Sequence, residues 1–174
     1  MEQNDFKCRF VHYICQLCSE DKGNAANLRK ADLTTLNAYV LSSLVKSGID
    51  ITKEYEFLPY SIVTAAIARS KDYKNGEVSF SKALASAEKY NDEKQRINDK
   101  RLRRLLACND IKELALVLRP TLILIQSRLK ENIDFEELLK DLCSFRFEDG
   151  RDRVKKKWAM QFYSTKPDEI KEAD

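Results

Sequence analysis

The sequence predicts an all-α protein, a helical bundle of about eight or nine helices. Only four glycines and three prolines interrupt its 174 residues, while leucine, alanine, lysine and glutamate recur throughout. Because the frequent residues are strong helix formers and helix breakers are rare, helices are favoured over a sheet.

The length favours one helical domain over residues 1–165, with two packed halves, residues 1–90 and 91–165, as the other possibility. Residues 166–174 lack apolar periodicity, so we expect a disordered acidic tail there. No apolar stretch is long enough for a signal segment or a bilayer span, and five cysteines are scattered along the chain. We therefore expect a reduced, cytoplasmic setting without membrane contact.

The first expected helix carries apolar side chains at helical spacing and ends before a turn at Gly23 and Asn24. It also carries His12, the only histidine, which we expect to be packed. The apolar stripe consists of Phe6, Phe10, Tyr13, Ile14 and Leu17.

Cys15 and Cys18 on the same helix have C-x-x-C spacing, which is formally compatible with a zinc site or a redox pair. A structural zinc site needs a second ligand pair, and the thiols of Cys108 and Cys143 stand alone in the sequence. The redox motif needs a preceding strand, which is absent. We therefore expect buried, reduced thiols, and neither a metal nor another cofactor.

Three further helices are expected in the first half of the chain. Residues 34–45 form an amphipathic helix closed by Gly48, and residues 58–70 form another with Pro59 in its first turn. After a polar loop, Ser79 caps a short helix.

The most basic surface of the protein directly precedes its most apolar helix, within residues 94–128. The first half of this stretch, KQRINDKRLRRLLACND, is expected to form a helix with its leucines on one side and four cations on the other. The cations are Arg96, Lys100, Arg103 and Arg104, with Arg101 on the flank.

Asp110 and Glu113 have the spacing of a capping box that starts the next helix. Residues 114–125 are apolar nearly all round, so we expect this helix to be buried on most sides at the centre of the bundle. Pro120 should kink it or split it in two.

Asp134 and Glu137 repeat the capping-box pattern, and Gly150 precedes the last helix. That helix has an apolar face and a cationic one. The apolar face contains Val154, Trp158 and Phe162, and the cationic face contains Arg153, Lys156 and Lys157.

Recognisable catalytic patterns are missing: there is no H-E-x-x-H, no G-x-S-x-G, no Walker loop and no dinucleotide glycine pattern. Chance pairs among 28 acidic residues stay open, although most alternate with lysines as on ordinary solvated helix faces. Residues 94–104 carry six cations against one acid on a chain of net charge +3, which indicates a polyanionic partner at one face. We interpret the chain as a binding protein, not an enzyme.

Four segments, SFSKALASAEK, RINDKRLRRLLACND, IDFEELLKDLCSF and RVKKKWAMQFYS, occur in this order. With them the chain resembles the small subunit of the type I-E CRISPR surveillance complex, Cascade, the CasB family. The resemblance implies a non-catalytic, all-α protein that sits as two copies along the inner side of the Cascade arch. Its implied partners are the backbone and large subunits, a second copy of itself, the guide RNA with its target DNA, and the displaced strand.

The resemblance also implies nucleic-acid contacts at Arg29, Lys30, Arg101, Arg119, Arg151 and Arg153. Arg103 and Arg104 could replace an arginine that some members carry at the position of Ala107. Together with the outward-facing cations, the candidate nucleic-acid-binding residues are Arg29, Lys30, Lys82, Arg96, Lys100, Arg101, Arg103, Arg104, Arg119, Arg151, Arg153 and Lys156.

Few aromatic residues accompany these cations, so we expect backbone electrostatics to dominate over base stacking. The alternative is a helical adaptor or structural protein whose basic faces dock acidic protein partners.

Overall fold

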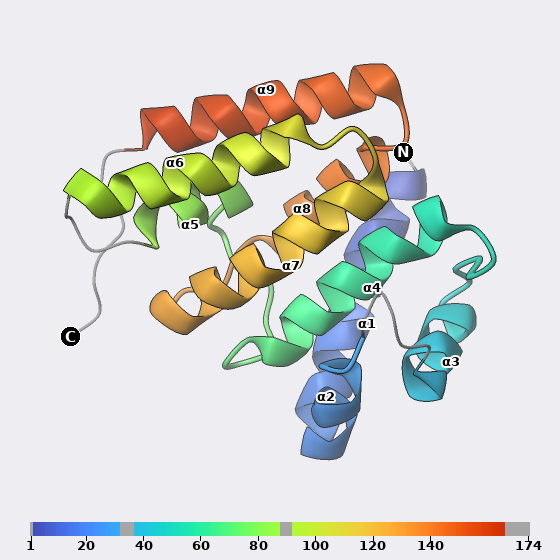
Figure 1. Cartoon of the computed structure of the whole chain (residues 1–174). Helices are drawn as coiled ribbons and strands as arrows, with labels where there is room; N and C mark the ends of the chain where they lie inside the picture. Colours follow the sequence, from blue (N-terminus) through green and yellow to red (C-terminus); the bar gives the residue numbers. More distant parts are fainter. Residues whose placement is uncertain (1, 32–36, 88–91, 166–174) are drawn as a thin grey trace.

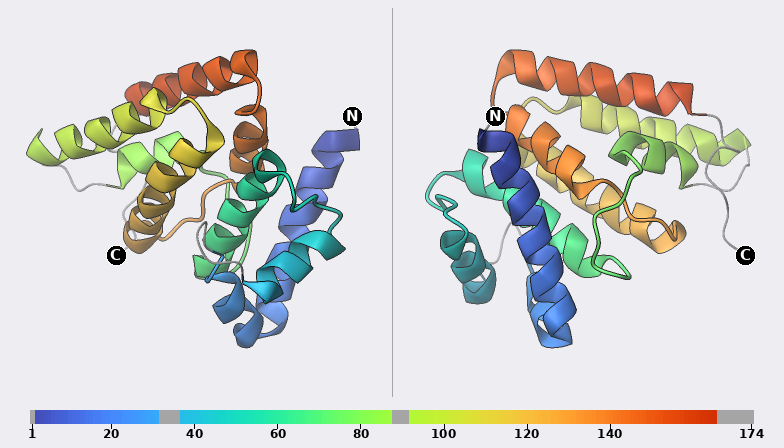
Figure 2. Two further views of the ribbon diagram at one scale, coloured as in Figure 1. Left: turned by 45° about the vertical axis from the view of Figure 1, so that its right-hand side comes forward. Right: turned by 180° about the vertical axis from the view of Figure 1, so that it is seen from behind.

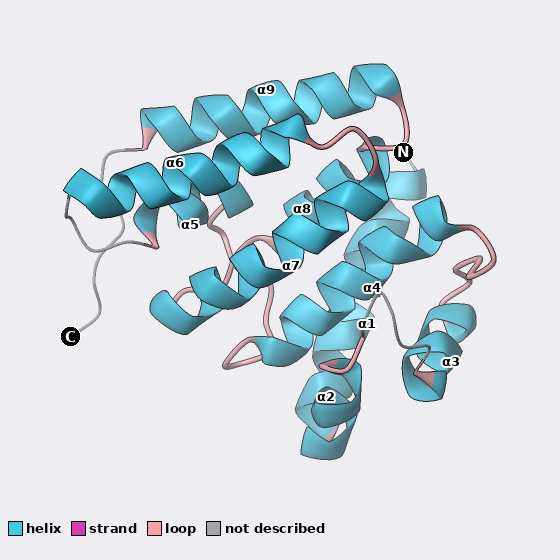
Figure 3. Cartoon of the chain, viewed as in Figure 1, coloured by secondary structure: helices cyan, strands magenta, loops and turns pink. Residues whose placement is uncertain are grey.

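A computed structural model of the chain describes residues 2–31, 37–87 and 92–165. Within these ranges the secondary structure is helical except for one isolated bridge between Val78 and Ile133, which confirms the all-α fold class (Figure 3). The helices are α1 (Glu2–Glu20), α2 (Lys22–Leu28), α3 (Ala38–Lys46), α4 (Glu54–Arg69), α5 (Phe80–Ser86), α6 (Asp92–Ala107), α7 (Ile111–Arg128), α8 (Phe135–Ser144) and α9 (Glu148–Ser164).

The helices α4, α7 and α8 form the middle of the molecule, and the other helices pack against them. At one end α6 and α9 lie side by side, with α5 against both, and at the other end α2 and α3 flank α4 (Figure 1). The view from behind shows α1 and α8 covering the opposite side of the molecule (Figure 2). Contacts of α4 with both α7 and α8 join the two ends of the molecule.

The central helix is α4 and not α7. All residues from 58 to 68 in α4 are buried, because α1, α2, α3, α7 and α8 surround it. The expectation that residues 114–125 form the buried centre is wrong, since Leu116 is 66% exposed and Ile123 is 44% exposed. Helix α7 packs between α4 and α6, and its third side faces solvent.

Neither Pro59 in α4 nor Pro120 in α7 interrupts its helix. Pro120 lies on the exposed side of an unbroken α7, where water can satisfy the Leu116 carbonyl that loses its donor. Helix α4 begins at Glu54, earlier than expected, so Pro59 lies in its second turn and not in its first.

Side-chain caps start α7 and α8 as the sequence predicts. The Asp110 carboxylate accepts from the Glu113 amide at 2.9 Å, and the Glu113 carboxylate accepts from the Asn109 amide at 2.9 Å. Asp134 accepts from the Glu137 amide at 2.9 Å. Ser79 precedes α5 as predicted, but its hydroxyl makes no capping bond.

Two local expectations about the N-terminal region are wrong. Gly23 lies within α2 and not in a turn, because the Asp21 side chain accepts from the Gly23 amide at 2.8 Å and caps a new helix. His12 is exposed on α1 and not packed, although its ring lies 3.0 Å from the Cys8 carbonyl of its own helix. Gly48, at φ +80°, closes α3 as expected.

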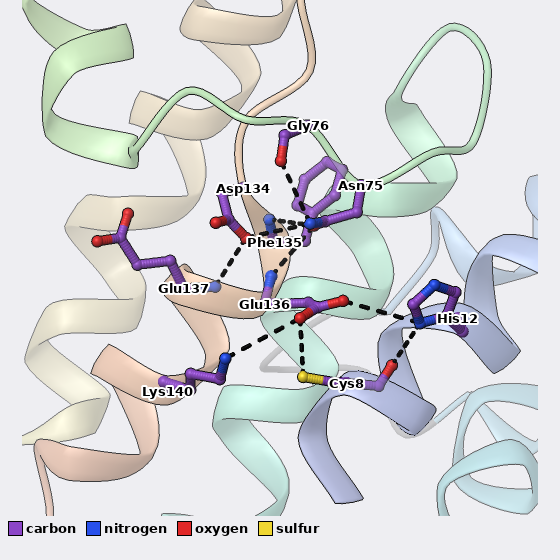
Figure 4. A network of polar contacts seen from close by, with 9 residues as sticks. All are labelled: Cys8, His12, Asn75, Gly76, Asp134, Phe135, Glu136, Glu137 and Lys140. Carbon is purple, nitrogen blue, oxygen red and sulfur yellow. Dashed lines mark hydrogen bonds and ion pairs between the residues drawn. The ribbon is translucent and has the colours of Figure 1, made fainter. Parts of the chain in front are cut away.

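The loop after α4 is bonded to the start of α8, and we call these contacts the Asn75 clasp (Figure 4). The Asn75 side-chain oxygen accepts from the amides of Phe135 at 2.7 Å and Glu136 at 3.2 Å. Its amide nitrogen donates to Asp134 at 3.2 Å. Beside it, a Cβ on Gly76 would lie 1.8 Å from the Asn132 carbonyl oxygen, so only glycine permits this approach.

Helix α1 also contacts the start of α8, at the Glu136 side chain (Figure 4). The Cys8 thiol donates to the Glu136 carboxylate at 2.8 Å, and that bond raises the pKa of the thiol. The His12 ring and the Lys140 ammonium lie 3.7 Å and 3.9 Å from the same carboxylate. Two segments distant in sequence, α1 and the loop around Asn75, therefore converge on the first turn of α8.

Trp158 anchors α9 in the core. It is 1% exposed, and its indole N–H donates to the Asp141 carboxylate at 2.7 Å. Lys157 was expected on the outer cationic face, but it pairs with Asp141 and, at 3.3 Å, with Glu137, because the buried carboxylate of Asp141 needs a cation. Burial nevertheless raises the pKa of Asp141.

Replacing Asn75 with alanine leaves the amides of Phe135 and Glu136 without their acceptor. We expect a loss of about 1–2 kcal/mol in the free energy of unfolding. Urea denaturation followed by circular dichroism measures it. Asn109→Ala, which removes an exposed amide, is the matched control and should change stability by less than about 0.5 kcal/mol. Equal stability of the two variants would contradict the role of the clasp.

The Trp158 indole should emit at a blue-shifted wavelength in the native protein and shift to the red on unfolding, because it is buried beside Phe80 and Phe145. Tyr163→Trp in a Trp158→Phe background provides a solvent-exposed comparison on the same helix. Matching native emission from both proteins would show that Trp158 is not enclosed.

Candidate nucleic-acid interface

The exposed side of α6 carries Lys100, Arg103 and Arg104, which we call the α6 cationic face. Leu102 and Leu105 on the opposite side are fully buried and hold the helix against the core. Arg103 is paired with Asp99 at 2.7 Å, whereas no carboxylate among the described residues pairs with Lys100 or Arg104. Arg96 belongs to α6, but its side chain lies outside the described residues.

Arg101 lies at the half-buried edge of this face. Its guanidinium donates to the Asn98 side-chain oxygen at 2.9 Å, and Asn98 in turn donates to the Leu84 carbonyl of α5 at 2.9 Å. Arg101 therefore helps to hold α6 against α5 in addition to contributing charge.

A second group of cations lies where α2, α4 and α7 meet, and we call it the α2–α4–α7 cluster: Arg29, Arg69 and Arg119. Arg29 donates to the Ala68 carbonyl at 2.6 Å, and Arg69 donates to the Arg29 carbonyl at 2.7 Å. Arg119 and Arg69 line one small cavity beside Ala31. Arg69, which the sequence analysis missed, thus connects Arg29 with Arg119, two candidates that are far apart in sequence. Lys30 is exposed next to them.

Helix α7 separates the α6 cationic face from Arg29 and Arg69, since it contacts α6 on one side and α4 on the other (Figure 1). The middle of its exposed side is an apolar stripe that contains Leu116, Pro120 and Ile123. The surface that spans α6, α7 and the end of α4 is therefore basic at both edges and apolar between them.

The candidates on α9 do not form one site. Arg151 is half-buried and donates to the Asn109 carbonyl in the α6–α7 loop at 2.6 Å. Arg153 follows about 200° further round the helix, is exposed and lines a different cleft. Lys156 is exposed on α9, and Lys82 is exposed on α5.

Tyr163 is an aromatic residue at this surface that the sequence analysis missed. Its ring is 60% exposed, and its hydroxyl lies 2.5 Å from the Asp99 carboxylate, which ties α9 to α6. This bond, together with burial and the charge of Asp99, raises the pKa of Tyr163. The helix spacing alone could have shown that Tyr163 points outward, but not that α6 passes beside it.

The sequence matches the family model described as CRISPR-associated protein Cse2 over residues 24–163. This segment is most of the chain and contains every candidate cation from Arg29 to Lys156. The chain belongs to the Cse2 family. The match confirms the resemblance to the CasB family. The chain is therefore a small subunit of the kind found in the CRISPR complex Cascade.

Solved Cse2-family structures share the fold. A Cse2-family CRISPR-associated protein from Thermus thermophilus has a TM-score of 0.72 and 21% identity, and the match covers 91% of this chain and 98% of that one. CasB from Thermobifida fusca has a TM-score of 0.67 and 18% identity, with 92% and 97% of the two chains covered. A structure of CasB from Thermus thermophilus has a TM-score of 0.68 and 23% identity, with 91% and 98% covered. No curated protein matches the sequence.

The residues that the structure describes show no clustering of three or more histidine, cysteine or acidic side chains able to bind a metal ion. Likewise, none of the described helices is long and apolar enough to cross a bilayer. Cys15 is half-buried and Cys18 buried on α1, and neither forms a disulfide. Burial raises the pKa of both thiols to about 11.

All five thiols should alkylate slowly near neutral pH, because the pKa of each is raised and the thiolate is the reactive form. The rates should rise as the pH approaches about 11, where Cys15, Cys18 and Cys143 ionise. Mass spectrometry after iodoacetamide treatment measures the rates, with protein unfolded in urea as the control. Rapid modification at neutral pH, or stoichiometric zinc by elemental analysis, would contradict inert thiols.

Proposed function

We propose that this Cse2-family protein is a non-catalytic, cytoplasmic subunit that binds nucleic-acid backbone within Cascade. In this role it stabilises the guide-target duplex and the displaced strand during antiviral defence. The observation that supports this most is the α6 cationic face, where Lys100 and Arg104 are exposed without a carboxylate partner among the described residues. Cations on a rigid helix neutralise phosphates without reading bases. Such binding suits a complex whose sequence specificity comes from guide pairing.

The α6 cationic face is held in a fixed position, which favours a role in binding over an ordinary solvated helix surface. Leu102 and Leu105 fix the helix, and the bond from Asn98 to the Leu84 carbonyl fixes its rotation. Because the helix is already fixed, only the side chains of these cations lose conformational freedom on meeting a phosphate. The α2–α4–α7 cluster adds a second contact region on the far side of α7, so a strand or duplex could follow both.

We further propose that the partners are the backbone and large subunits and a second copy of this chain. The exposed stripe of Leu116, Pro120 and Ile123 favours a protein contact, because apolar side chains do not stabilise the charged backbone of a nucleic acid. The same stripe supports the second candidate function, a helical adaptor whose apolar strip and basic edges dock an acidic protein surface. The two candidates differ in whether the cations meet phosphates or carboxylates.

The test is the double variant Lys100→Ala and Arg104→Ala in the assembled complex. We expect weaker binding of single-stranded DNA to a similar degree for every sequence, since phosphates carry no base identity. The slope of log K against log salt should flatten by about 0.7 for each lost phosphate contact, or about 1.4 for the pair. Fluorescence anisotropy over a salt series measures both quantities.

The matched control is Lys22→Ala with Lys46→Ala, which removes two exposed cations from α2 and α3. Both double variants should unfold within about 0.5 kcal/mol of the wild type, because all four side chains are exposed. If the α6 variant assembles normally but keeps the affinity and salt slope of the control, the nucleic-acid proposal fails and the adaptor stands.

A further inference from the structure

A cleft of about 710 Å³ opens where α1, α4, α8 and the start of α9 meet, away from the α6 cationic face. Its volume is that of a site for a nucleotide-sized ligand. Three cations line it, and they come from parts of the chain that no sequence motif connects: Lys7, Arg146 and Arg153.

The charge in the cleft is unbalanced toward the positive. None of Lys7, Arg146 and Arg153 has a carboxylate within ion-pair distance among the described residues. Of the two acidic residues that line the cleft, Glu56 lies 3.7 Å from Lys53 outside it, and Asp149 sits in the first turn of α9, where the helix dipole stabilises its charge. An anion entering the cleft therefore meets cations that are not already paired.

Arg146 is held in place by aromatic rings rather than by an acid. Its guanidinium carbon lies 4.0 Å from the ring centroid of Tyr55 and 5.3 Å from that of Phe147. The rings contact the guanidinium through their π faces, so its N–H donors remain available for bidentate bonds to an oxyanion. Such a stacked arginine is preorganised for a phosphate or a carboxylate.

Phe147 supplies a second surface beside this arginine. Its side chain is 61% exposed, although the residue starts α9 and its backbone is fixed by the bond from the Arg151 amide to its carbonyl, at 2.8 Å. An exposed phenyl ring next to free guanidinium donors matches the two parts of an unpaired nucleotide, whose base stacks and whose phosphate accepts hydrogen bonds. An acidic peptide would use the cations but leave the ring without a role.

We propose that this cleft binds one nucleotide of an unpaired strand, with its base on Phe147 and its phosphate on Arg146 and the neighbouring cations. A base inside a duplex is stacked on both faces and is not available to Phe147, so the site selects single strands over duplexes. This site is separate from the α6 cationic face and does not depend on that face binding phosphate.

The experiment compares Arg146→Ala, Phe147→Ala and Lys22→Ala with wild type, using a short fluorescein-labelled oligothymidylate and a duplex of equal length. Phe147→Ala should weaken oligothymidylate binding by about fivefold or more and leave the salt slope unchanged, because stacking is not electrostatic. Arg146→Ala should weaken binding and also flatten the slope. Lys22→Ala should bind as the wild type does, and binding to the duplex should be unaffected by Phe147→Ala.

Arg146→Lys gives a further check, because it keeps the charge but loses the planar fork and the ring stack, and it should not restore wild-type affinity. The α6 double variant is measured in parallel. Loss of binding in that variant alone, with the cleft variants unchanged, would overturn the cleft proposal and leave the proposed function standing. Arg146-dependent binding of a polyglutamate peptide in place of oligothymidylate would assign the cleft to an acidic protein segment instead.

Discussion

The buried end of α4 imposes the constraint on which the rest of the structure depends. The last carbonyl groups of a helix have no donors of their own, and leaving them unpaired inside a protein is costly. Arg29 at the end of α2 donates to the Ala68 carbonyl at 2.6 Å, and Gln126 of α7 adds a second donor, at 2.7 Å, to the Ala66 carbonyl that already accepts from the Ser70 amide. Polar bonds thus fix both neighbouring helices relative to α4, in addition to apolar contact.

This constraint gives several arginines two roles. Arg29 caps α4, Arg101 supports Asn98, and Arg151 bonds the α6–α7 loop, yet all three are candidates for phosphate contacts. A guanidinium has five donors, so one part can serve the fold while the rest remains available. Substituting these residues would change stability and binding together, whereas Lys100 and Arg104 report on binding alone.

Local patterns were enough to predict much of the fold. The capping spacing of Asp110 and Glu113 and the burial of Trp158 follow from side chains a few residues apart, and the structure contains both. Local patterns could not rank α4 against α7 as the central helix. Both are apolar, and what leaves Leu116 exposed is the number of helices around α7, which its own residues do not encode.

The candidate site was less predictable than the fold for the same reason. Charge periodicity found the α6 cationic face, because that face belongs to one helix. It missed Arg69, which matters only through its contact with Arg29 at the end of α2. It also missed Lys7 and Arg146, which meet the predicted candidate Arg153 only after α1 has packed against α8 and the start of α9.

The Asn75 clasp has a consequence for how the protein folds. It joins residues that are 60 positions apart, so closing it requires ordering a long intervening chain whose helices make their own contacts first. Because the entropy of closing that loop opposes contacts of such range, we expect the clasp to form after the local helical contacts. Weakening the clasp should therefore accelerate unfolding and leave the folding rate nearly unchanged. In this chain, we therefore expect the Asn75 clasp to act on the lifetime of the native state and the local helices on the speed at which it forms.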